Sequence, residues 1–248
     1  MKKILLLVIT SITLLSCKET PTKKSKNKTP FPEHLSKVFE MHGGIDKWKE
    51  LRQLSFDKGN EKHLVDLQSR KSLITSDNYT IGNNGKDVWL QQKDSTSFRG
   101  NKDFYHNLFF YFYAMPFVLA DDGITYEEAT PLTFENIYYP GFKISYKANV
   151  GSSPDDNYYL YYNPKSYKME WLAYSVTYFS KKASDKTNLI RYNDWVNVDG
   201  FTLPKSINWY KKDENNIPIE PAGAPMIFSN QKVSTKKLDD SLFNQPKE

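Results

Sequence analysis

Over most of its length, the chain alternates short runs of aromatic and β-branched residues with residues that favour turns. The runs 79–81 and 88–90, for example, flank Asn84-Gly85, a pair that tolerates the positive φ angles of a type I′ turn. Residues 142–146 alternate apolar and polar side chains, which gives a strand one buried and one solvated face. This pattern restricts the chain to an antiparallel sheet built from consecutive hairpins.

The alternation of strand and turn continues to the C-terminal region. The further predicted strands are residues 158–162, 169–178, 189–198, 201–210 and 226–233. The strands do not alternate regularly with helices, as parallel βαβ units would require. We therefore predict a mainly β fold with a few helices, in the α+β class.

Two short helices are predicted in residues 32–54, where apolar residues recur at helical spacing. Gly43-Gly44 separates them, because glycine favours the left-handed conformation that ends a helix. His42 precedes this pair, and we expect it to be structural rather than a ligand.

Residues 103–115 differ from the rest of the chain, because apolar side chains occupy every face of a helix drawn through them. Pro116 ends the segment. A helix that is apolar all round must be buried all round, so we expect it to cover or plug the concave face of the sheet. A fully buried strand is the competing interpretation.

The N-terminus has the order of a bacterial lipoprotein signal. A positive start is followed by an apolar run and then by Leu14-Leu15-Ser16-Cys17, and Cys17 is the only cysteine of the chain. The resemblance to a lipobox implies that residues 1–17 are a signal peptide ending at a lipidated Cys17. An ordinary secretory leader with an incidental cysteine is the alternative. We expect residues 18–31 to be a disordered Lys-rich tether and residues 32–248 to be one domain.

The positive charge of the chain is concentrated near the N-terminus. Of the formal charge of +5, residues 1–17 carry +2 and residues 18–28 carry +4, which leaves −1 for residues 29–248. A domain that is nearly neutral lacks the basic face that phosphate neutralisation requires, so we expect no nucleic-acid partner.

Three motifs in the domain keep a common order and spacing. They are His42-Gly43-Gly44-Ile45-Asp46-Lys47-Trp48, then Asn163-Pro164-Lys165-Ser166-Tyr167, then Tyr192-Asn193-Asp194-Trp195 with Val198-Asp199-Gly200-Phe201-Thr202-Leu203-Pro204. Together they resemble the LolA/LolB-like lipoprotein-localisation fold over residues 33–240, and especially its envelope relatives of unknown function. The resemblance implies an unclosed antiparallel β-barrel, or half-barrel, with helices over its open side. It also implies a space between sheet and helices that receives acyl chains.

An apolar cavity of this kind fits a composition of 17 Tyr, 15 Phe and 5 Trp. The residues that we predict to line it are Trp89, Leu108, Phe109, Phe112, Met115, Trp171, Tyr192 and Trp209. Ordinary core packing is the alternative for each of these side chains.

The sequence contains no arrangement of residues that indicates catalysis. The four histidines are scattered, and no metalloprotease, nucleophile-elbow or phosphate-loop motif is present. Most of the adjacent acidic pairs lie beside turn residues, and Asp194, the one acid within an apolar strand, is expected to hydrogen-bond a neighbouring turn. We therefore predict no catalytic residues, no metal and no cofactor.

These patterns predict a non-enzymatic lipoprotein of the bacterial envelope that binds a lipid or acyl chain in a half-barrel. The predicted location is the outer membrane, on its periplasmic face or at the cell surface, with the anchor at Cys17 as the membrane contact. The alternatives are an interaction or sensor module with a solid aromatic core that binds an envelope protein, and a carbohydrate-binding surface lipoprotein.

Overall fold

A computed structural model describes residues 30–146, 156–180, 182, 184 and 186–247. The predicted signal peptide 1–17, with Cys17, and residues 18–29 of the predicted tether lie outside the described residues. Phe31, which the prediction assigned to the tether, packs against Phe39 and Tyr126 with ring centroids 5.0 and 5.9 Å apart. The folded unit therefore begins at Phe31, because this ring belongs to the core.

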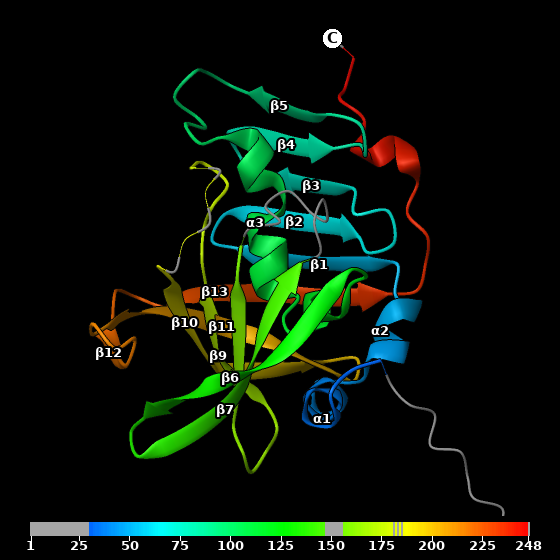
Figure 1. The fold of residues 1–248 in the computed structure, drawn as a ribbon. Helices are drawn as coiled ribbons and strands as arrows, with labels where there is room; N and C mark the ends of the chain where they lie inside the picture. Colours follow the sequence, from blue (N-terminus) through cyan, green and yellow to red (C-terminus); the bar gives the residue numbers. More distant parts are fainter. Residues whose placement is uncertain (1–29, 147–155, 181, 183, 185, 248) are drawn as a thin grey trace, which may run out of the picture. The chain divides into compact units, whose positions relative to one another are not determined.

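The domain is built on one antiparallel sheet, whose order is β5-β4-β3-β2-β1-β13-β11-β10-β9-β8-β7-β6, with β12 paired to β11 (Figure 1). The strands of the first half are β1 (Gln53–Lys58), β2 (Glu61–Asp66), β3 (Ser72–Thr75), β4 (Tyr79–Asn83) and β5 (Val88–Gln92). Those of the second half are β6 (Ile124–Phe134), β7 (Ile137–Tyr146), β8 (Tyr158–Tyr162), β9 (Met169–Tyr174), β10 (Asn188–Val198), β11 (Phe201–Lys212), β12 (Pro218–Pro221) and β13 (Met226–Ser234).

The sheet consists of two meanders joined in its middle. Strands β1 to β5 run outward from the centre, the chain crosses to the other end of the sheet, and β6 to β13 return until β13 pairs with β1. Because β5 and β6 end the strand order and do not pair, the sheet is not closed. The predicted mainly β, half-open antiparallel architecture is confirmed.

The hairpin turns follow the local sequence, with one correction. Asn83 pairs with Val88, so the β4–β5 loop has four residues rather than the two of the predicted type I′ turn. In this loop Gly85 has a φ of 90°, and Asn84 Oδ1 accepts hydrogen bonds from the backbone N–H groups of Lys86 and Asp87 at 2.9 Å. The Asn84 side chain thus stabilises a wider turn than the dipeptide alone predicts.

The two predicted N-terminal helices are present as α1 (Glu33–Met41) and α2 (Ile45–Glu50). His42 lies between them and is fully buried. Its Nε2 accepts a hydrogen bond from the Met169 backbone N–H at 3.1 Å, so Nδ1 carries the proton that it donates to Thr202 O at 2.9 Å. Burial lowers the pKa of His42 to about 4. The imidazole therefore joins α1 to the second meander as a neutral group.

The all-apolar segment forms α3 (Lys102–Tyr113), which begins where Asn101 Oδ1 accepts the Phe104 N–H at 3.0 Å. The helix packs over β3, β4 and β5 (Figure 1) and is followed by the short 3₁₀ helix η1 (Phe117–Ala120). The helix prediction is confirmed and the strand alternative is wrong. The expectation of burial on all sides is also wrong, because the first two turns of α3 are only half-buried or exposed.

Most buried side chains lie in one cluster between the helices and the facing side of the sheet. A second, smaller cluster is centred on Trp171 and Tyr139. The short 3₁₀ helix η2 (Asp240–Phe243) packs near the end of the chain. In the described part of the chain, no helix combines the length and the apolar character that crossing a bilayer requires.

Candidate functional site: an aromatic cleft beside α3

The two sides of α3 have different surroundings. On one side, which we call the sealed side, Tyr105, Phe109 and Tyr113 follow each other at a spacing of four residues. The Tyr113 ring stacks on Phe56 at 4.1 Å, and the Phe56 ring stacks in turn on His63 at 4.7 Å. Aromatic rings of the sheet and of the helix therefore fill the space on this side.

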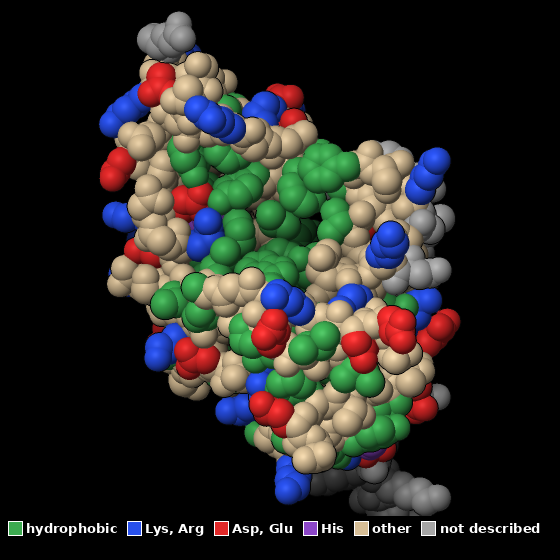
Figure 2. All heavy atoms as spheres, turned by 90° about the vertical axis from the view of Figure 1, so that its left-hand side faces the viewer, with side chains coloured by type: hydrophobic (Ala, Val, Ile, Leu, Met, Phe, Trp, Pro, Cys, Tyr) green, Lys and Arg blue, Asp and Glu red, His purple; other side chains and the backbone are tan. Residues whose placement is uncertain are grey.

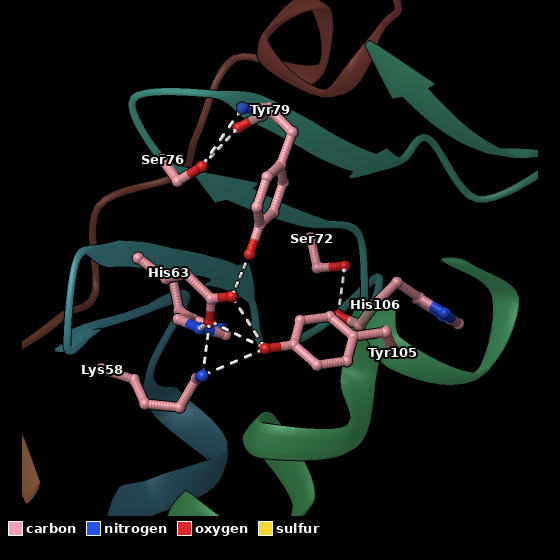
Figure 3. A network of polar contacts seen from close by, with 8 residues as sticks. Lys58, His63, Ser72, Ser76, Tyr79, Tyr105 and His106 are labelled. Atoms are coloured by element: carbon pink, nitrogen blue, oxygen red, sulfur yellow. Dashed lines mark hydrogen bonds and ion pairs between the residues drawn. The ribbon is translucent and has the colours of Figure 1, made fainter. Parts of the chain in front are cut away.

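A buried carboxylate holds the sealed side to the sheet (Figure 3). Glu61, at the start of β2, is 4 % exposed. Its carboxylate accepts hydrogen bonds from Tyr105 OH at 2.7 Å and from Tyr79 OH. It also forms an ion pair with Lys58 Nζ at 2.8 Å and a hydrogen bond with His63 Nε2 at 3.1 Å. The Glu61 cluster, which consists of these five residues, links α3 to β1, β2 and β4.

The pKa of Glu61 reflects this environment. Burial alone raises the pKa of a carboxyl group, because it disfavours the charged form. The hydrogen bonds from His63, Lys58, Tyr79 and Tyr105 outweigh burial and lower the pKa of Glu61 to about 2. The group is therefore a charged structural anchor at neutral pH.

On the other side of α3, which we call the cleft side, the packing leaves a cleft of about 280 Å³. Small-molecule sites have volumes of roughly 300–1,000 Å³, so the volume of the cleft lies just below that range. Figure 2 shows hydrophobic side chains gathered around a hollow on one face of the molecule. The residues that line the cleft are Asp103, Phe104, Asn107, Leu108, Tyr111, Phe112, Asp121, Asp122, Tyr146, Asp156, Tyr158, Tyr174, Val176 and Tyr178.

Both walls of the cleft are mainly aromatic. Helix α3 contributes the half-buried side chains of Phe104, Leu108 and Tyr111, and the opposite wall comes from β7, β8, β9 and the residues after β9. The floor is fixed by Phe112, whose ring lies 5.1 Å from that of Tyr174. The cleft is thus an apolar space between a helix and the sheet.

Apolar residues also extend past the cleft into solvent. Phe104 contacts Tyr178 and Phe179, with ring centroids 5.0 Å apart in both pairs. Phe179 is 66 % exposed, and Val176, which lines the cleft, is 38 % exposed. Exposed apolar groups that are continuous with a cleft are typical of binding sites rather than of protein core.

A comparison with protein families identifies the family of the chain. The model of DUF6503, a family of unknown function, matches residues 54–217, more than half of the chain. The chain belongs to this family. The matched DUF6503 region includes the Glu61 cluster and every residue that lines the cleft.

Solved structures that resemble this DUF6503 chain are distant in sequence. A LolA superfamily protein from Nitrosomonas europaea is 9 % identical with a TM-score of 0.41, and the match covers 84 % of this chain and 96 % of that one. A DUF1329 family protein from Desulfovibrio piger is 11 % identical with a TM-score of 0.47, with coverages of 84 % and 95 %. The first of these belongs to the superfamily that the three motifs resemble. No curated protein matches the chain.

Of the eight predicted cavity residues, two line the cleft, namely Leu108 and Phe112. Two others support it from behind. Trp209 Nε1 donates a hydrogen bond to Tyr174 OH at 3.0 Å, and Tyr192 OH donates to Phe112 O at 2.9 Å. The remaining four lie elsewhere.

Phe109 faces the sealed side, where its ring lies 5.5 Å from Tyr105. Met115 follows α3 and is 1 % exposed within the core. Leu108 lies on the cleft side with Phe104. The sequence does not predict which residues face the cleft, because an all-apolar helix has no polar face to fix its rotation.

Trp89 does not line the cleft. Its Nε1 donates to Phe243 O at 2.8 Å, so the C-terminal helix η2 covers it. Through the register of β3 to β5, Trp89 shares a face of the sheet with Leu73. The neighbouring residue Ser72 points to the opposite face of the sheet and donates a hydrogen bond to α3. Trp89 therefore lies on the face turned away from α3.

Trp171 is also placed away from the cleft. It is fully buried in the second cluster, with the Arg191 guanidinium 5.2 Å from its ring centroid. The next residue, Leu172, belongs to the main core. Successive strand residues point to opposite faces, so Trp171 lies on the face turned away from α3.

The sequence analysis missed the tyrosines of the opposite wall, Tyr146, Tyr158 and Tyr174. Each lies at one end of its strand in the structure. The alternation in residues 142–146 placed Tyr146 on the buried face and was the available indication. Asp194 accepts a hydrogen bond from Ser206 Oγ at 3.0 Å, so its partner lies in the paired strand β11 and not in a neighbouring turn as predicted. Within the described residues, no three His, Cys, Asp or Glu side chains are grouped to hold a metal ion.

Proposed function

We propose that the chain is a non-enzymatic bacterial envelope lipoprotein that binds an apolar ligand in the cleft beside α3. The observation that carries the proposal is the contrast between the two sides of this helix. The fold packs aromatic rings and the Glu61 cluster against one side, yet it leaves Phe104, Leu108 and Tyr111 facing an open space. Leaving apolar surface in contact with water costs about 25 cal/mol per Å², so a ligand that covers it gains that free energy.

The anchor forms the second part of the proposal. A chain lipidated at Cys17 stays at one membrane, so the cleft serves as an acceptor, buffer or sensor of apolar molecules at the outer membrane. Stable anchoring needs more than one acyl chain, and the lipobox resemblance implies several. Replacement Cys17→Ser should move the chain from the membrane fraction of lysed cells to the soluble fraction. Retention of the variant in the membrane fraction contradicts lipidation.

Binding is tested with the purified protein and the uncharged fluorescent probe N-phenyl-1-naphthylamine. We expect saturable fluorescence enhancement with one site per chain. In Leu108→Trp the larger ring occupies the cleft, so we expect probe affinity to fall about tenfold or more, which corresponds to about 1.4 kcal/mol.

The matched control is Leu242→Trp. Leu242 is 48 % exposed in η2 and does not line the cleft, so this variant should bind the probe as the unsubstituted chain does. Absence of saturable binding, or equal loss in both variants, overturns the proposal.

A protein-interaction role is the second candidate, and one observation favours it. The β6–β7 hairpin presents Ile137 and Tyr138 to solvent, and they are 37 % and 62 % exposed. Copurification of a stoichiometric envelope protein that is lost in Tyr138→Ser, but kept in Leu108→Trp, supports this role. Carbohydrate binding through exposed tryptophans and tyrosines is not favoured, because all five tryptophans are buried or half-buried and Tyr138 is the only exposed tyrosine among the described residues.

A further inference from the structure

Three tyrosines of the cleft have hydroxyls that the fold leaves unpaired. Tyr111 of α3, Tyr146 of β7 and Tyr158 of β8 all line the cleft. In the described part of the chain, none of their hydroxyls makes a hydrogen bond. By contrast, the hydroxyl of Tyr174 in the same wall accepts a hydrogen bond from Trp209 Nε1 at 3.0 Å.

The three hydroxyls lie near one another. The rings of Tyr146 and Tyr158 are 5.9 Å apart and nearly perpendicular, at 80°. Charge on Tyr111 raises the pKa of both Tyr146 and Tyr158, and such an influence requires that the groups lie close together. Because Tyr111 comes from the helix and the other two from the sheet, the hydroxyls belong to both walls of the cleft.

These hydroxyls face the open space of the cleft. The hydroxyls of Tyr113 and Tyr139 are fully buried without a partner in the described part of the chain, but those of the three cleft tyrosines are not. A half-buried tyrosine hydroxyl usually finds a hydrogen-bond partner, which in an open cleft is water. A ligand that covers the aromatic walls displaces this water. It must then supply the partner itself or leave the hydroxyl unpaired, which is unfavourable.

The neighbouring carboxylates bond to other groups. The two carboxylate oxygens of Asp121 lie 2.7 and 2.8 Å from Arg70 Nη2. Asp156 Oδ1 accepts the backbone N–H of Thr177 at 2.6 Å. The described part of the chain therefore leaves the partner of the three hydroxyls to solvent or to a ligand.

The surroundings determine which kind of partner fits. A phenolic hydroxyl both donates and accepts, but the ring draws on the oxygen lone pair, so donation is its stronger mode. Burial is the largest cause that raises the pKa of each of the three hydroxyls, so the cleft disfavours a negative charge. Its described lining contains no lysine, arginine or histidine to compensate an anion. An uncharged oxygen that accepts hydrogen bonds meets both conditions.

We infer that the cleft takes apolar molecules that carry an uncharged carbonyl oxygen, as in an ester or a ketone, and that the hydroxyls of Tyr111, Tyr146 and Tyr158 donate hydrogen bonds to it. A carbonyl oxygen has two lone pairs, so two of the three hydroxyls can donate at once. The apolar part of the molecule lies between α3 and strands β7 to β9. This inference rests on the proposed function, because it concerns the ligand of the same cleft.

The experiment measures displacement of N-phenyl-1-naphthylamine from the purified protein by three naphthalenes of the same shape. They are 2-acetylnaphthalene, 2-isopropenylnaphthalene, in which a methylene group replaces the carbonyl oxygen, and 2-naphthoate. The unsubstituted chain should bind the ketone more tightly than the carboxylate. In the triple variant Tyr111→Phe, Tyr146→Phe, Tyr158→Phe, affinity for the ketone should fall about tenfold, whereas affinity for the hydrocarbon should stay within about twofold.

The matched control is Tyr138→Phe. Tyr138 is 62 % exposed in the β6–β7 hairpin and does not line the cleft. This variant should leave the affinities for the ketone and the hydrocarbon unchanged. Hydrocarbon binding by the triple variant serves as a second control, because it shows that the walls of the cleft are intact.

Equal losses of ketone and hydrocarbon affinity in the triple variant overturn the inference, because the hydroxyls then support the wall rather than the ligand. Unchanged ketone affinity in that variant, failure of the ketone to displace the probe, or tighter binding of 2-naphthoate than of the ketone also overturns it. In each of these cases the probe is bound and the proposed function stands. If the probe itself does not bind, the proposed function falls, and the inference falls with it.

Discussion

The sealed side and the cleft side of α3 have nearly the same composition but different surroundings. Tyr105 and Phe109 on one side are matched by Tyr111 and Leu108 on the other. The sealed side meets rings from β1 and β2 and a buried carboxylate, whereas the cleft side faces an open space of about 280 Å³. An apolar helix face therefore indicates burial or binding equally well. The residues that pack opposite the helix face decide whether it is buried or binds a ligand.

The largest expected effect comes from truncating a ring on the sealed side. Phe56→Ala should lower the free energy of unfolding by about 3–5 kcal/mol, because it leaves a cavity beneath Tyr113 and His63. Leu108→Ala on the cleft side should cost only about 1 kcal/mol, because this half-buried side chain already borders open space. Chemical denaturation of both variants measures the difference. Equal losses contradict the distinction between the two sides.

The second largest effect concerns the charge of Glu61, which holds the sealed side of α3 to the sheet. Glu61→Gln should cost about 3 kcal/mol or more at neutral pH, because it leaves Lys58 without its ionic partner in a largely buried position. The exposed pair of Glu220 and Lys211 provides the control, and Glu220→Gln should leave stability unchanged. Denaturation at pH 7 tests both.

The same substitution has a characteristic pH dependence. The pKa of Glu61 is about 2 in the folded chain, below its ordinary value of 4.5. The unfolded state therefore takes up a proton first, and the stabilisation is lost as the pH falls from about 4.5 towards 2. The difference in stability between the unsubstituted chain and Glu61→Gln should narrow over this interval. A difference that stays constant there excludes an ionised Glu61 as the anchor.

The smallest expected effect is a difference in stability between substitutions of two tyrosines on the sealed side of α3. In the described part of the chain, the Tyr113 hydroxyl is buried without a hydrogen-bond partner. Tyr113→Phe should therefore leave stability unchanged or raise it by up to about 1 kcal/mol. Tyr105→Phe removes a hydrogen bond to a charged carboxylate and should cost about 1.5–3 kcal/mol. Thermal unfolding of the two variants gives the comparison, and a larger loss in Tyr113→Phe contradicts it.

Local features of the fold could be predicted because neighbouring residues determine them. The alternation in residues 142–146 predicted a strand, the short gap between the predicted strands 189–198 and 201–210 indicated a hairpin, and Pro116 predicted the end of an apolar helix. The pairing of β1 with β13 could not be predicted in this way. It joins residues about 170 to 180 positions apart, as in Gln53 with Ser234, and no local period specifies such a partner.

The candidate site was predicted only in part for the same reason. Leu108 and Phe112 were predicted correctly because they lie in the all-apolar segment of residues 103–115. Glu61 was missed, because its partners come from three other elements and β2 shows no regular alternation of polar and apolar residues. Trp89 and Trp171 were misplaced, since a buried ring gives no sign in the sequence of which face of the sheet it occupies.

By itself, the sequence determined the periods of the elements, most of the turns between them and an all-apolar helix in a β-rich domain. These follow from backbone geometry and from interactions within a few residues. Only the tertiary structure decided the rotation of α3, the side that the Glu61 cluster closes, and the position of the aromatic cleft. Those depend on surfaces that distant segments bring together, and the hydrophobic effect that joins them has no direction of its own.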